Sequence, residues 1–90
     1  MKLEFDSDFV DDLKKIRRSD PKLLKRVWEK LSFFEKNPKH LSLRLHKLSG
    51  SMTDVWSVSV NRKIRMIFYY KSDDVAYFVD IGSHDEVYRK

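Results

Sequence analysis

The spacing of the hydrophobic residues changes halfway along the chain, and this change limits the folds that the chain can adopt. Between Asp6 and Asn37 the apolar residues recur every three or four positions, which is the period of an amphipathic helix. From Asp54 onward they recur at every second position, the period of a strand with one buried face. Helices followed by strands predict an α+β fold, with the helices on one face of a mostly antiparallel sheet.

The 90 residues suffice for one hydrophobic core and are too few for two. The hydrophobic fraction is 41%, with six Phe, four Tyr and two Trp, so a packed interior is expected even with 37% charged residues. We therefore expect a single domain over residues 1–90.

Three further features concern the compartment and the partners. The chain has no cysteine, which favours a reducing compartment and excludes a disulfide framework or a thiol nucleophile. It has neither an apolar stretch of about 18 residues nor the pattern of a signal peptide, so we expect a cytoplasmic protein with no membrane partner. The net charge of +5 indicates a polyanionic partner.

Capping residues mark the expected helices. The first follows Asp6 or Ser7, either of which can accept hydrogen bonds from the free amides of its first turn. The second starts at Asp20-Pro21 and stops at Asn37-Pro38, because proline suits the first turn of a helix and disfavours helix in the residue before it. So short a connection predicts a helical hairpin.

The remaining elements are expected to be strands. Residues 1–5 alternate loosely and form a short N-terminal strand. Residues 55–60, 64–70 and 75–81 form three consecutive antiparallel strands, the last two joined by a turn at 72–74. The expected order is strand, helix, helix, strand, strand, strand.

Two segments in the second half carry cationic side chains of interest. Arg44, His46 and Lys47 alternate with leucines before Gly50, and the alternative interpretation is a connecting strand with its polar side in water. Arg62 and Lys63 lie at a turn, where charges are usually just solvated. Arg65 lies inside an apolar strand, where a guanidinium is costly unless it faces a cleft or forms a buried salt bridge.

A third segment follows the last strand, where His84, Tyr88 and Arg89 come within six residues. Side chains just past a strand end are held by the sheet and still reach solvent, which suits a functional site. The alternative is a frayed polar tail with Tyr88 on the core. No histidine shows metal-ligand spacing to another ligand, so we expect no metal site.

In combination these segments resemble a known family. The order of elements, with LSG at 48–50, IRMIFY at 64–69 and IGSHDEVY at 81–88, resembles the RelE/ParE superfamily of bacterial type II toxins. The resemblance is strongest to the RelE, YoeB and YafQ branch of ribosome-dependent mRNA interferases. It covers essentially the whole chain, although the helices match only in pattern.

The resemblance implies an endonuclease that cuts mRNA in the ribosomal A site and is restrained by an antitoxin wrapped around it. Arg65 resembles the strand arginine that contacts the scissile phosphate. His84 falls where relatives carry a catalytic Arg or His, and Tyr88 falls where RelE carries a functional Tyr. His46 occupies the place of a His or Glu thought to act as base.

These residue types suit RNA cleavage by a ribose 2′-hydroxyl, which needs a base, an acid and a cation. Either His46 or His84 is the base and the other is the acid, because histidine ordinarily titrates near neutral pH. Arg65 stabilises the developing charge, and Tyr88 orients the nucleotide or assists proton transfer. The expected product carries a 2′,3′-cyclic phosphate, and no cofactor is expected.

One departure from the family affects RNA binding. Relatives carry Lys or Arg around positions 57 and 59, where this chain has Ser57 and Ser59. Phosphate binding is therefore expected to depend on four other cations, Arg44, Lys47, Arg62 and Lys63. The basic residues of the helices have acids nearby and are interpreted as solvated faces that can contact ribosomal RNA. They include Lys14, Lys15, Lys25 and Arg26.

Two other functions stay open at this point: a ParE-like inhibitor of DNA gyrase, and a catalytically inactive basic binding module of the same fold. The expected partners are an acidic antitoxin, the ribosome and mRNA, and the toxin alone is expected to be a monomer. If the site is real, His46, Arg65, His84 and Tyr88 should converge on one concave, basic face of the sheet, opposite or beside the helical hairpin.

Overall fold

The structure is a computed structural model that describes residues 1–48, 54–83 and 87. It contains two helices, one short 3-10 turn and five strands. In chain order these are β1 (Lys2–Phe5), α1 (Ser7–Ser19), α2 (Pro21–Lys36), η1 (Leu41–Leu43), β2 (His46–Lys47), β3 (Val55–Ser59), β4 (Ile64–Ser72) and β5 (Val75–Ser83). The expected α+β fold is confirmed.

The strands form one sheet in the order β1-β5-β4-β3-β2. The pairs β2–β3, β3–β4 and β4–β5 are antiparallel, whereas β1 lies parallel to β5. The four-strand order expected from the sequence needs one correction, since β2 adds a fifth strand at the sheet edge. β2 has only two residues, too short to show an alternating pattern of its own.

Both helices begin at the predicted caps. The Asp6 carboxylate accepts a hydrogen bond from the Asp8 amide at 3.0 Å, and the Asp20 carboxylate accepts one from the Leu23 amide at 3.1 Å. The Asp20 amide also donates to the Ile16 carbonyl at 2.7 Å, so one residue ends α1 and starts α2. This tight junction produces the helical hairpin.

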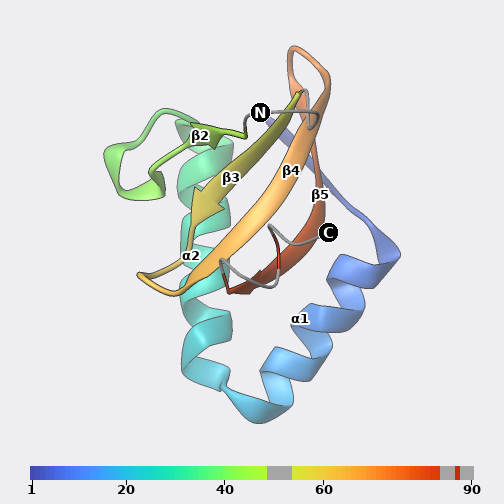
Figure 1. Cartoon of the computed structure of the whole chain (residues 1–90), viewed down its shortest axis with the longest axis vertical. Coiled ribbons are helices and arrows are strands. Elements are labelled where there is room, and N and C mark those ends of the chain that lie inside the picture. The colour runs from blue at the N-terminus through green and yellow to red at the C-terminus, as the bar shows by residue number, and fades with distance from the viewer. Residues whose placement is uncertain (49–53, 84–86, 88–90) are drawn as a thin grey trace.

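The main core lies between the helices and one face of the sheet (Figure 1). At its centre the fully buried Phe34 of α2 contacts Phe68 of β4 and Phe78 of β5 edge-on, with ring centroids 4.8 and 5.5 Å apart. Edge-to-face aromatic pairs of this kind add stability beyond the burial of their area. They fix the helical hairpin against the central strands.

The opposite side of the sheet is the one that neither α1 nor α2 covers, and in that sense it is called the helix-free face below. Val58, Met66 and Phe68 point into the main core, so their strand neighbours point the other way. The helix-free face therefore presents Val55, Ser57, Ser59, Arg65, Ile67 and Tyr69. A smaller apolar cluster covers part of it, in which Leu48, Ile67 and Val87 are buried.

None of the helices in the described part of the chain is both long enough and apolar enough to cross a membrane.

Candidate functional site

Arg65 lies on the helix-free face in the middle of the sheet. It pairs with Ser59 on β3 and with Gly82 on β5. Its neighbours across the sheet are therefore a small side chain on one side and a glycine without a side chain on the other. The arginine is half-buried, and within the described residues its guanidinium has neither an ion pair nor a hydrogen bond. The buried salt bridge that was one alternative for Arg65 is therefore not formed with any described residue.

Arg65 instead lines a cavity of about 350 Å³ at the open edge of β3. Of the nine residues that line this cavity, five are cationic and none is acidic. We call it the basic cavity. Its lining consists of Arg26, Lys30, Ser42, Arg44, Ser59, Val60, Asn61, Arg62 and Arg65.

The basic cavity lies beside the part of β3 that the short strand β2 does not cover. His46 pairs with Ser57, so an uninterrupted ladder would place Arg44 opposite Ser59. Arg44 instead adopts a left-handed backbone conformation, with φ 47° and ψ 49°, and its amide donates to the Leu41 carbonyl at 3.2 Å. This conformation is unfavourable for a residue with a Cβ atom. It leaves the β3 edge beside Ser59 without a partner among the described strands.

The turn between β3 and β4 is held by its own hydrogen bonds. The Asn61 side-chain oxygen accepts from the Lys63 amide at 2.8 Å and from the Ile64 amide at 2.7 Å. The Ser59 hydroxyl donates to the Asn61 carbonyl at 2.8 Å. Such Asx-type bonds make a turn rigid. They therefore fix the backbone on both sides of Arg62, which lines the basic cavity.

Two residues of the basic cavity come from α2 and were not predicted as site residues. Arg26 was interpreted as part of a solvated helix face, and Lys30 was not singled out. Lys30 is only 9% exposed, although lysine is almost never so buried without a partner. A signal existed in the sequence, because Lys30 lies three residues after Val27 and four before Phe34, within the apolar stripe of the helix.

His46 shares the helix-free face with Arg65. It pairs with Ser57, which puts its side chain on the same face as Ser57, and it is exposed. Two strand spacings and a two-residue offset separate the Cα atoms of His46 and Arg65 by roughly 12 Å. His46 does not line the basic cavity, so a substrate contacting both residues would lie across β3.

The other predicted RNA-binding residues divide between two places. Arg44 and Arg62 line the basic cavity, whereas Lys63 is exposed at the turn and does not. Lys47 pairs with Trp56 and lies over its ring, with the ammonium 5.9 Å from the ring centroid, on the opposite face of β2 from His46. Lys47 therefore points away from Arg65.

Ser57 and Ser59 are buried, with exposed fractions of 0% and 7%. They present no charge on the helix-free face, so cations there must come from other segments.

His84 and Tyr88 lie outside the described residues, and their roles stay predictions. His46 and Arg65 share one face of the sheet, and the expected convergence of all four residues stays a prediction. Val87, the described residue nearest the C-terminus, is 4% exposed and packs in the apolar cluster with Ile67 on that face.

No group of three or more His, Asp or Glu side chains lies close enough together to hold a metal ion within residues 1–48, 54–83 and 87.

Solved structures of toxins, alone or with an antitoxin, are similar in fold to this helical hairpin on one face of a five-stranded sheet. The YoeB/ParE toxin from Agrobacterium tumefaciens is 18% identical, with a TM-score of 0.79 over 93% of this chain and 99% of that one. The DinJ–YafQ complex from E. coli matches at 17% identity and a TM-score of 0.79, over 97% of each chain. The YoeB–YefM complex from Staphylococcus aureus matches at 19% identity and a TM-score of 0.76, over 93% of this chain and 97% of that one.

The chain therefore has the fold of the YoeB and YafQ toxins, and the fold implied by the resemblance in sequence is confirmed. No protein-family model and no curated protein sequence matches it significantly.

Proposed function

We propose that this protein is the toxin of a type II toxin–antitoxin system and that it cleaves mRNA in the ribosomal A site. The observation that carries this proposal is the position of Arg65, a half-buried guanidinium on the same sheet face as His46 and in the wall of a cavity lined by five cations. Its fold, shared with YoeB and YafQ, supports the same assignment.

The proposed reaction is an attack of the ribose 2′-hydroxyl on the adjacent phosphorus. A histidine base, His46 or His84, removes the hydroxyl proton as the new O–P bond forms. The bond from phosphorus to the 5′-oxygen breaks, and the other histidine protonates that oxygen. The products are a 2′,3′-cyclic phosphate and a free 5′-hydroxyl, so atoms and protons balance.

Arg65 has the chemistry to stabilise the transition state of this reaction. A guanidinium donates two parallel hydrogen bonds to phosphoryl oxygens and keeps its charge at every working pH. Because Arg65 has no described ion-pair partner to give up, these donors are available to a phosphate. Tyr88 is proposed to orient the nucleotide or to assist proton transfer.

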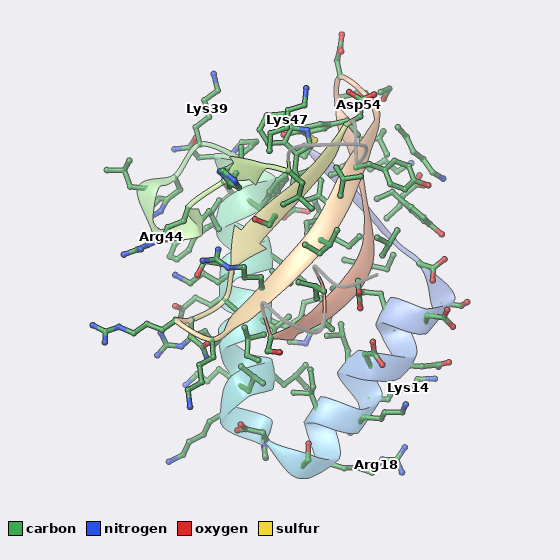
Figure 2. The ribbon with its side chains drawn as sticks, viewed as in Figure 1. Lys14, Arg18, Lys39, Arg44, Lys47 and Asp54 are labelled. Carbon is green, nitrogen blue, oxygen red and sulfur yellow. The ribbon has the colours of Figure 1, made fainter. Side chains whose placement is uncertain are left out.

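The test is primer extension on mRNA in translating ribosomes. The wild-type protein should produce codon-linked cuts, and Arg65→Ala, His46→Ala and His84→Ala should each lose them. Arg18→Ala is the matched control, since Arg18 is an exposed cation at the far end of α1 (Figure 2). Intact mRNA together with stalled gyrase–DNA complexes would favour a ParE-like inhibitor. Intact mRNA without them would favour an inactive binding module.

The proposed protein partner is an antitoxin with an acidic segment. Two structural neighbours are toxins in complex with YefM and DinJ. In this chain the five cations of the basic cavity have complementary charge to such a segment. A neighbouring reading frame that encodes a short acidic chain should, when co-expressed, bind this protein and suppress the cuts. Continued cutting in the presence of the bound chain would contradict this.

A further inference from the structure

We infer that α2 contributes to RNA binding: Lys30 and Arg26 bind a backbone phosphate of the RNA in the basic cavity, next to the scissile phosphate at Arg65. This inference rests on the proposed function for the identity of the ligand as RNA. It adds two residues that the resemblance to RelE-type toxins does not assign, and a second phosphate subsite beside the catalytic one.

The charge of Lys30 is buried with little compensation. Its ammonium donates to the Ser42 carbonyl at the long distance of 3.4 Å and lies 5.9 Å from the Phe33 ring centroid. Within the described residues it forms no ion pair. A buried charge without a counter-ion is costly, because the weak contacts replace its lost hydration only in part. A phosphate in the basic cavity supplies the missing anion.

Like charges accumulate in the basic cavity. Arg26 and Lys30 are one helical turn apart, where two cations repel each other. Arg44, Arg62 and Arg65 bring three more cations to the same cavity from the segment before β2, the β3–β4 turn and β4. Five cations from four segments, with no acid in the lining, form a site that an anion stabilises.

The open edge of β3 lets cations of a helix behind the sheet line the basic cavity. Ser59 is small and neutral and lines the cavity at this edge. Because no described strand covers the edge, Lys30 and Arg26 line the same space as Arg65, which belongs to the other face. The cavity volume of about 350 Å³ is at the lower end for small-ligand sites, which suits a short stretch of RNA backbone.

The experiment measures binding of a short single-stranded RNA with 2′-O-methyl groups throughout, which lacks the nucleophile and cannot be cut. The variants are Lys30→Met, which keeps the apolar stem, and Arg26→Gln, which changes an exposed residue and spares the core. Lys25→Met is the control, because Lys25 is an exposed cation of the same helix outside the basic cavity. Affinity is measured over a series of salt concentrations, and each variant's melting temperature is recorded.

Lys30→Met and Arg26→Gln should each weaken binding about tenfold, the size expected for loss of one charge-assisted contact. Each should also lower the slope of log K against log salt by about 0.7, the value for one phosphate contact on a single strand. Lys25→Met should change neither. Lys30→Met should melt at or above the wild-type temperature, because it removes a buried charge.

Unchanged affinity and slope in both Lys30→Met and Arg26→Gln would overturn the inference, as would a wild-type protein that does not bind the RNA. The outcome is separate from that of the proposed function, because the assay needs neither ribosome nor cleavage. If both variants lower the salt slope of RNA binding and the wild-type protein leaves mRNA intact, the phosphate subsite is upheld and the nuclease function is refuted.

Discussion

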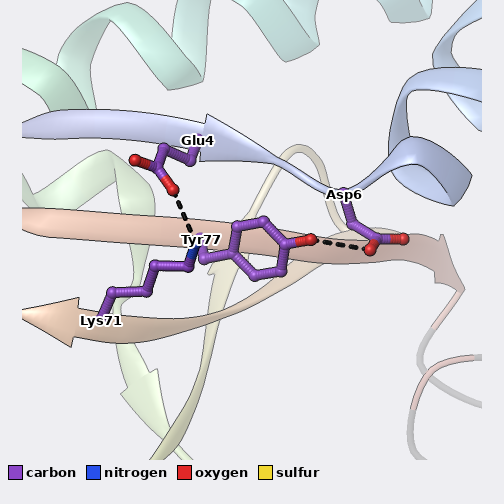
Figure 3. A network of polar contacts seen from close by, with 4 residues as sticks. All are labelled: Glu4, Asp6, Lys71 and Tyr77. Carbon is purple, nitrogen blue, oxygen red and sulfur yellow. Dashed lines mark hydrogen bonds and ion pairs between the residues drawn. The ribbon is translucent and has the colours of Figure 1, made fainter.

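The hydroxyl of Tyr77 on β5 donates a 2.8 Å hydrogen bond to the carboxylate of Asp6, the residue that caps α1 (Figure 3). Beside it, the Lys71 ammonium lies 2.8 Å from the Glu4 carboxylate and 4.4 Å from the Tyr77 ring centroid. The first contact connects β5 to the residue between β1 and α1, and the second connects β4 to β1. They hold the start of α1 against the sheet.

Because of Tyr77, the stability of the fold should decrease at alkaline pH. The hydrogen bond to Asp6, together with burial and the charge of Asp6, raises the pKa of Tyr77 from 10.0 to about 12. A pKa that is raised in the folded state gives stability that is full below pH 10 and is lost as the pH rises through about 12. Tyr77→Phe should therefore be less stable than wild type at pH 8.

Urea unfolding of the wild type and Tyr77→Phe between pH 8 and pH 12 measures this effect. The difference in unfolding free energy should be constant up to about pH 10 and should shrink toward pH 12. Using the difference cancels the titration of the lysines, which both proteins share. A difference that stays the same over the whole range would contradict the role of the Asp6 hydrogen bond.

Substitutions of Arg44 should affect RNA binding and folding stability separately. Its left-handed conformation is open to glycine and costs a β-branched residue about 1–2 kcal/mol. Arg44→Gly should keep the wild-type stability and Arg44→Val should lose about that amount, as measured by urea unfolding. Both should lower the salt slope of RNA binding by about 0.7. Equal stability of the two variants would show that the backbone at residue 44 relaxes.

The contribution of Arg65 to the rate of mRNA cutting should depend on the geometry of its guanidinium as well as on its charge. Arg65→Ala should lower the rate of mRNA cutting by about 100-fold to 1,000-fold, the usual loss for a group that stabilises transition-state charge. Arg65→Lys keeps the charge but loses the two parallel donors, so its rate should lie between those of wild type and alanine variant. Quantitative primer extension gives both rates. A lysine variant as active as wild type would assign Arg65 a purely electrostatic role.

His46 should show the behaviour of a proton-transfer group. His46→Ala should lower the cutting rate by about 100-fold to 10,000-fold, the range for loss of a general acid or base. Added imidazole should restore part of the rate, because the exposed position on β2 leaves room for it. Imidazole should not rescue Arg65→Ala, which serves as the control. A slow His46→Ala variant that imidazole does not rescue would indicate a positioning role instead.

Phe34 should be among the costliest core residues to truncate. It is fully buried between Phe68 and Phe78. Phe34→Ala should lower the unfolding free energy by about 3–5 kcal/mol, since it leaves a cavity where the helices meet the sheet. Phe34→Leu refills part of the space and should lose less. Urea unfolding of both variants tests this, and a loss below about 1 kcal/mol for alanine would mean that the core collapses around the gap.

The sequence by itself determined the local structure of this protein. The spacing of apolar residues indicated two helices followed by strands, and Asp6 and Asp20 marked both helix starts, because capping and periodicity depend on residues only a few positions apart. Strand lengths were less well predicted, since β4 and β5 continue to Ser72 and Ser83 through pairing with each other. Among the site residues, the unusual position of Arg65 in an apolar strand was also visible.

Only the tertiary structure decided which side chains meet. Strand register put His46 and Arg65 on one face and turned Lys47 to the other, because a shift of one residue along a strand reverses the face. β2 has only two residues and therefore no period to read. Because it begins at His46, after the left-handed Arg44, the edge of β3 beside Ser59 stays open. The basic cavity then joined Lys30 of α2 to Ser59 and Arg62, which are distant in sequence. Such a meeting depends on how the helix packs across the sheet, and no local pattern encodes it.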